Sequence, residues 1–159
     1  MKNEENKKLI ERFPFLIPRN RWTDEIHKDY DYSVTELDFM PDGWRIAFGE
    51  QMCQEIMDEL IVNDWVDKYR IFDIKEKFGH LCWYDNYGSD KIHKEIIPKY
   101  VDLSTKTCIK CGRPAKWMTT WWISPYCDEC KKEIESKNIE HFVTLEEWER
   151  DITEEDSEE

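Results

Sequence analysis

Four cysteines in two pairs are the residues of this sequence with the clearest chemistry. Two residues separate Cys108 from Cys111 and Cys127 from Cys130, and fifteen residues lie between the pairs. Two residues between thiols let one tight turn direct both sulfurs at a single ion, and the longer stretch accommodates a short hairpin. Four thiolates close a tetrahedron around Zn²⁺ and leave no position open for a substrate. The spacing therefore predicts a structural zinc ribbon that folds because it binds the metal.

Disulfides and a redox dithiol are the alternative uses of paired cysteines. Disulfides require export, and the opening residues, MKNEENKKLIERF, contain neither an apolar core nor a small-residue cleavage site. A redox dithiol uses one CxxC motif near a βαβ pattern rather than two in series. Cys53 and Cys82 stand apart from the pairs, and we expect both to be small buried hydrophobic residues. We therefore expect a reducing, cytoplasmic location.

Length and charge limit the possible architectures. A chain of 159 residues with eight tryptophans can build one compact domain with a zinc appendage. No apolar run approaches the length of a membrane span. The net charge is −13, but residues 105–132 carry six basic and two acidic residues, whereas residues 133–159 carry two basic and twelve acidic ones. The ribbon is therefore locally basic, and most of the acidity follows it.

The elements that must position the ribbon indicate an α+β fold. Residues 44–64 predict an amphipathic helix, because Phe48, Met52, Ile56 and Leu60 recur every four positions with Cys53, Met57 and Ile61 beside them. Residues 69–78 and 81–84 flank Gly79-His80 and predict an antiparallel hairpin. Residues 89–103 predict another helix, interrupted at Pro98.

These elements suggest four parts of the chain. We expect an α+β core in residues 1–104, with the hairpin packed against helices, and the four-cysteine zinc ribbon packed on it in residues 105–131. A short C-terminal helical segment is expected in residues 132–151 and an acidic disordered tail in residues 152–159. Thr144-Leu-Glu-Glu147 is a capping box, so the last helix should begin at Leu145.

Several motifs occur in a characteristic order: Asp42-Gly43-Trp44, then KEKFG at residues 75–79, then the two CxxC pairs, the first followed by Gly112. In this the chain resembles an uncharacterised family of small zinc-ribbon proteins found in bacterial and phage genomes. It departs from the family pattern at Cys82, where an arginine commonly follows the leucine. The resemblance covers residues 40–130 and implies the metal, the fold and a phage or mobile-element origin, but no activity. In that setting, the partner would belong to host or defence machinery.

The hairpin offers one candidate ligand site. Lys75 and Lys77 share a strand face and could bind a phosphate or a carboxylate, while Glu76 points the other way. The reading that we favour is a solvated strand face, charged to prevent edge pairing. The sequence contains no G-x-S-x-G motif, phosphate loop or HExxH motif. We therefore expect no catalytic residues and a protein that is not an enzyme.

The ribbon raises a choice between nucleic acid and protein as the partner. Basic residues interleaved with aromatic ones could track phosphates and stack on bases: Lys110, Arg113, Lys116, Trp117, Trp121 and Trp122. The alternative is that the tryptophans pack the ribbon onto the core, with at least one of Trp121 and Trp122 facing inward. Because the overall acidity opposes an approach to nucleic acid, we favour a protein partner with a basic surface and keep nucleic acid as the second reading.

Overall fold

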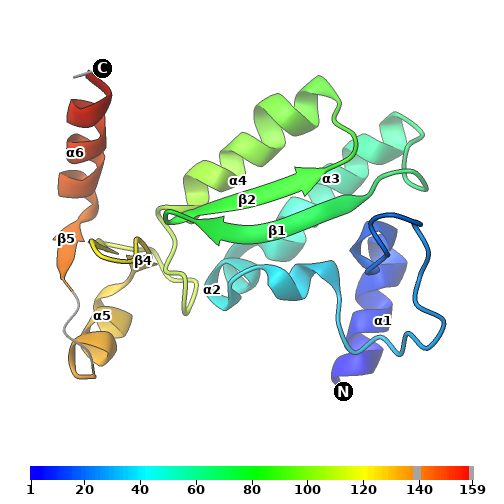
Figure 1. The fold of residues 1–159 in the computed structure, drawn as a ribbon, viewed down its shortest axis with the longest axis horizontal. Helices are drawn as coiled ribbons and strands as arrows, with labels where there is room; N and C mark the ends of the chain where they lie inside the picture. Colours follow the sequence, from blue (N-terminus) through cyan, green and yellow to red (C-terminus); the bar gives the residue numbers. More distant parts are fainter. Residues whose placement is uncertain (138–140, 158–159) are drawn as a thin grey trace.

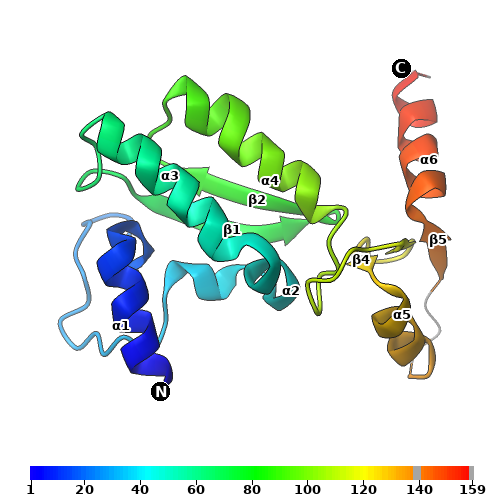
Figure 2. The ribbon, with the colours of Figure 1, turned by 180° about the vertical axis from the view of Figure 1, so that it is seen from behind.

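The computed structural model describes residues 1–137 and 141–157 and has the α+β architecture expected from the sequence (Figure 1). An antiparallel hairpin, β1 (Ile71–Lys77) and β2 (His80–Asp85), forms one layer of the core. Helices α3 (Glu50–Val62) and α4 (Ile97–Ser104) cover one face of it (Figure 2). Helix α1 (Lys2–Arg12) lies at one end of this core, and the cysteine-containing segment lies at the other (Figures 1 and 2).

The apolar repeat of the predicted first core helix is buried as expected. Phe48, Met52, Ile56 and Leu60 are at most 2% exposed. Ile61 is 59% exposed, so the prediction that it lies beside the apolar face is wrong. Cys53 and Met57, each one position after a buried residue of the repeat, are buried or packed on the core, so the buried face narrows toward the C-terminal end of α3.

Both core helices begin with a π turn. Residues Arg45–Gly49 join the short α2 (Asp42–Trp44) to α3, and residues Ile92–Ile96 precede α4. Pro98 follows this π turn within one continuous helical stretch, and its ring and missing N–H prevent the regular hydrogen bond to the preceding turn. The predicted interruption is therefore a change of helical pitch ahead of Pro98.

The hairpin closes through Phe78 and Gly79, with Lys77 paired to His80. Both turn residues have positive φ, 52° and 83°, as a type I′ turn requires. The turn thus lies one residue earlier than the Gly79-His80 pair suggested. Its tip leaves Phe78 63% exposed.

A second, three-stranded sheet belongs to the cysteine-containing segment. Its central strand β3 (Trp117–Thr119) pairs with β4 (Pro125–Tyr126) on one side and with β5 (Phe142–Thr144) on the other. Helix α5 (Asp128–Glu135) follows β4. We call residues 105–135 together with β5 the metal module.

The C-terminal segment differs from its prediction in two ways. It contributes strand β5 to the metal module, so residue 131 is not a boundary. Helix α6 (Leu145–Ser157) begins at the predicted residue, and its capping box is formed, with Glu147 N–H donating to Thr144 Oγ1 at 3.1 Å. Because α6 continues to Ser157, the prediction of a disordered tail is wrong for residues 152–157. The last two residues of that predicted tail, 158–159, lie outside the described residues.

The metal module is joined to the core by main-chain contacts around Gly43. The N–H of Gly43 donates to the carbonyl of Ile109 at 2.9 Å. Trp44, which is fully buried, donates its indole N–H to the carbonyl of Thr107 at 3.0 Å. Within residues 1–137 and 141–157, no helix combines the length and apolar character needed to cross a bilayer.

Candidate metal centre

The structure brings the four predicted cysteines together. The Sγ atoms of Cys108, Cys111, Cys127 and Cys130 all lie within 4.8 Å of one another, and all four residues are free thiols. Three of them are buried and Cys111 is partly exposed. The spacing of the pairs was therefore sufficient to identify the complete cluster.

Two local structures aim the sulfurs. After Cys108, a turn is closed by the N–H of Gly112, which donates to the Cys108 carbonyl at 3.0 Å with Gly112 at a φ of 85°. Cys127 caps the N-terminus of α5, where its sulfur accepts from the N–H of Cys130 at 3.5 Å. Amide groups directed at sulfur stabilise thiolates, which are the form that binds metal.

The donor set fits a metal ion of the zinc type. Tetrahedral zinc with Zn–S bonds of about 2.3 Å holds its sulfurs about 3.8 Å apart, and Cys111 Sγ lies 3.5 Å from Cys127 Sγ. Burial raises the pKa of Cys111 and of Cys130, whereas at Cys108 main-chain N–H groups outweigh burial and lower the pKa. A cation would offset the cost of collecting thiolates here. The cluster can therefore hold a metal ion in a closed site, compatible with a structural zinc.

The core contributes to the shape of the centre through Gly43. A Cβ atom added to Gly43 would lie 2.1 Å from the carbonyl oxygen of Cys108, and one added to Gly112 would lie 2.6 Å from the carbonyl oxygen of Gly43. The two backbones touch, with no room for a side chain between them. Asp42-Gly43-Trp44 is thus the part of the core that receives the first cysteine turn, a role that the sequence pattern did not reveal.

Three basic residues of the module form ion pairs with α5. Lys110 pairs with Glu133 at 2.9 Å, Lys116 with Asp128 at 3.0 Å, and Arg113 with Glu129. Trp117 donates its indole N–H to Asp128 at 2.8 Å and lies beneath the ammonium group of Lys131. These contacts hold Trp117 in the module, and they lower the net positive charge around it.

The candidate ligands on the hairpin have neighbours of their own. Lys75 lies 3.4 Å from a carboxylate oxygen of Asp73 and sits over the ring of Tyr84, while Lys77 sits over Phe78. Glu76 accepts a hydrogen bond from the N–H of Gly79 at 2.8 Å. The KEKFG stretch therefore has a structural use, because Glu76 secures the turn that Phe78 and Gly79 make.

Trp121 and Trp122 are both exposed, by 91% and 70%. The expectation that at least one of them faces inward is wrong, because β3 ends at Thr119 and strand alternation stops there. The following loop folds around the hydroxyl of Thr119, which accepts from the N–H of Ser124 at 2.9 Å. Both tryptophans line a hollow of about 450 Å³ with Phe78 and Ile123. We call Phe78, Trp121 and Trp122 the aromatic patch.

Comparisons of the chain with protein-family models, with curated proteins and with solved structures give no match. The resemblance to small zinc-ribbon proteins therefore stays a prediction. The proposals that follow depend on the geometry of the site.

Proposed function

We propose that this chain is a zinc-stabilised, non-enzymatic protein that binds another protein through the aromatic patch. The exposure of Phe78, Trp121 and Trp122 at one place is the observation that carries the proposal. Large contiguous patches of exposed apolar side chains are uncommon on monomeric proteins and mark interaction sites. Tryptophan is also among the residues that contribute most to protein interfaces.

The patch is held from two sides, which favours binding. Phe78 belongs to the hairpin turn of the core, and the two tryptophans belong to the metal module. The turn packs closely on the tryptophan loop, since a Cβ atom on Gly79 would lie 2.9 Å from Cγ2 of Ile123. A surface that is already ordered loses little conformational entropy when a partner binds. The metal would then serve binding by fixing one side of the patch.

Nucleic acid is the second candidate, because exposed tryptophans can stack on unpaired bases. The ion pairs of Lys110, Arg113 and Lys116 with α5 argue against it, since binding to phosphates would have to compete with them. Replacing these three residues with glutamate should abolish retention of a mixed oligonucleotide pool if nucleic acid is the ligand. Unchanged retention would exclude this face as a phosphate-binding surface.

The proposed function is tested with two variants of the tagged full chain. Trp121→Ala/Trp122→Ala removes the patch, and Trp22→Ala removes a tryptophan that is 90% exposed but lies outside it. Lysate of the native host is split, half is treated with nuclease, and bound proteins are identified. We expect one defined protein to bind wild type and Trp22→Ala in both halves, and to be lost from the double variant.

Three results would contradict this function. The first is equal binding of that protein to the double variant. The second is loss of all bound protein after nuclease treatment, which would favour nucleic acid. The third is a concentration-dependent dimer of the free wild type, absent in the double variant, in sedimentation velocity. That result would assign the patch to self-association.

The identity of the metal belongs to the same proposal. Four thiolates without a carboxylate or an open position are the ligand set of structural zinc. Elemental analysis of protein purified without added metal should give one zinc per chain, and Cys111→Ser should lower this content.

A further inference from the structure

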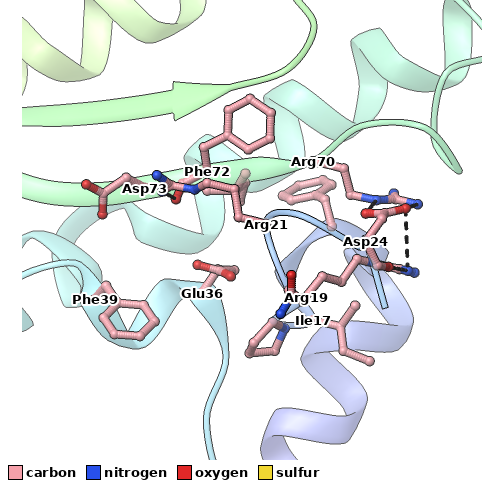
Figure 3. A pocket seen from close by; sticks show the side chains of 13 residues that line it. Ile17, Arg19, Arg21, Asp24, Glu36, Phe39, Arg70, Phe72 and Asp73 are labelled. Carbon is pink, nitrogen blue, oxygen red and sulfur yellow. Dashed lines mark hydrogen bonds and ion pairs between the residues drawn. The ribbon is translucent and has the colours of Figure 1, made fainter. Parts of the chain in front are cut away.

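A second hollow, of about 330 Å³, lies at the opposite end of β1 from the aromatic patch (Figure 3). Its walls come from three segments that are distant in sequence: residues 15–24, the 3₁₀ turn Glu36–Phe39, and the start of β1. The side chains that matter to its chemistry are Arg21, Glu36, Phe39, Phe72 and Asp73. No part of the proposed function uses them.

Two of the three arginines that line the hollow are already paired. Arg70 makes two contacts with the carboxylate of Asp24, at 2.7 Å and 3.2 Å. Arg19 donates to the main-chain carbonyl of Asp24 at 2.8 Å and lies 3.9 Å from its carboxylate. An anion entering the hollow would therefore find these guanidinium groups occupied.

Glu36 makes no hydrogen bond or close ion pair with a described residue, although the charge of Arg21 acts on it from a distance. Its partly buried carboxyl accepts no hydrogen bond from any residue that the structure describes, and it points toward β1 in Figure 3. Burial, and then the charge of Asp73, raise the pKa of Glu36 to about 7, while Arg21 opposes them. A carboxyl placed like this is stabilised by a donor that also carries positive charge.

Two exposed aromatic residues also line the hollow. Phe39 is 58% exposed and Phe72 is 43% exposed. The guanidinium of Arg21, on the exposed loop, already sits 5.9 Å from the centre of the Phe72 ring and donates to the Phe72 carbonyl. The Phe72 ring thus already lies beside one guanidinium group, that of Arg21, because cations are attracted to the faces of aromatic rings.

We propose that this hollow binds the guanidinium or ammonium group of a basic side chain from a protein partner, with Glu36 as its acceptor and Phe39 and Phe72 as its walls. The hollow's own Arg21, whose guanidinium lies over the Phe72 ring, is the precedent for such an occupant. The site is independent of the aromatic patch, so either one can fail without the other.

The test uses two matched peptides and the zinc-loaded full chain. Acetyl-Gly-Arg-Gly-amide carries the guanidinium, and the citrulline peptide replaces it with a neutral group of the same shape. In ¹H–¹⁵N spectra, we expect the arginine peptide to shift the amides of Glu36, Phe72 and Asp73, and the citrulline peptide to leave them unchanged. Equal shifts with both peptides, or none with either, would overturn the proposal.

Two variants locate the acceptor. Glu36→Gln keeps the shape of the side chain and should weaken binding of the arginine peptide at least tenfold. Glu25→Gln changes an exposed carboxylate that does not line the hollow and should bind the peptide like wild type. Binding by Glu36→Gln at wild-type affinity would overturn the proposal. Tighter binding of spermidine than of the peptide would overturn the assignment to a protein side chain.

Discussion

Among single residues, Glu36 has the clearest effect on stability. Its pKa of about 7 in the folded protein lies above the ordinary value of 4.5, so the unfolded chain loses this proton first as the pH rises. Between pH 4.5 and 7 the folded state is therefore progressively destabilised, and above pH 7 the full cost is present. The ionised carboxylate of Glu36 therefore weakens the fold at neutral and alkaline pH.

We expect Glu36→Gln to stabilise the protein in a pH-dependent way. Its free energy of unfolding should exceed that of wild type by about 1 to 2 kcal/mol at pH 8, since solvent screening reduces the cost of a partly exposed charge. At pH 4 the two proteins should be equal. Urea denaturation at both pH values measures the difference, with Glu25→Gln as the control. A difference that does not change with pH would contradict the argument.

Some of the residues at these sites could be identified from the sequence, and others could not. The cysteine cluster was predictable because ligand type and spacing are set by the metal and need no knowledge of the fold. Glu36 was not, because its surroundings come from three distant segments. Trp121 and Trp122 were misjudged because the end of β3 could not be located within two residues.

At the scale of elements, the first π turn and the Gly43 contact decide how the core meets the metal module. We expect Gly43→Ala to lower the free energy of unfolding by about 1 to 3 kcal/mol or more, because the new methyl group must displace the backbone of Cys108. Gly49 is the matched control. An added Cβ there meets side-chain atoms of Arg45 and Leu37 no closer than 3.4 Å.

Gly49→Ala should therefore be neutral or stabilise the protein by up to about 1 kcal/mol, since alanine favours helix. Thermal or chemical denaturation should give a lower free energy of unfolding for Gly43→Ala than for wild type, and an equal or higher one for Gly49→Ala. Equal effects of the two substitutions would mean that the module can shift away from the core without cost.

The capping box of α6 gives a second prediction for an element. Thr144→Ala removes the oxygen that accepts the N–H of Glu147, and Thr144→Ser retains it. We expect the alanine variant to lose about 1 kcal/mol of local stability, seen as faster amide exchange in residues 145–154 than in the serine variant. Identical exchange in both would show that packing alone holds the start of α6.

Elements were predicted well where periodicity extends over several turns, as in the helix that buries Phe48 to Leu60. Strand β5 was missed because three residues carry too little pattern, and because its partner β3 lies more than twenty residues earlier. The pairing is set by tertiary contacts rather than by local preference.

For the whole molecule, the two parts differ in what holds them together. The core has a continuous apolar interior, from Leu9 to Tyr100. In the metal module, the buried cluster consists of Cys108, Cys127 and Cys130, with Cys111 and Tyr126 packed against it. Apart from these residues, the buried apolar side chains of the module are Met118 and Ala115, which are too few to replace the metal.

We expect chelation to unfold the metal module and leave the core folded. Addition of a strong zinc chelator should collapse the amide dispersion of residues 105–135 and reduce helical ellipticity by the share of α5, while the amides of α3 and the hairpin persist. Restoring zinc should reverse the change, and magnesium should not. Simultaneous loss of the α3 amides would contradict independent stability of the core.

The contact between Gly43 and Gly112 has a consequence for the history of the chain. Each glycine is required by the main chain that faces it, one in the core and one behind the first pair of cysteines. Exchanging the metal module for another would therefore require both surfaces to be rebuilt. We expect relatives of this chain to keep or lose glycine at positions 43 and 112 together.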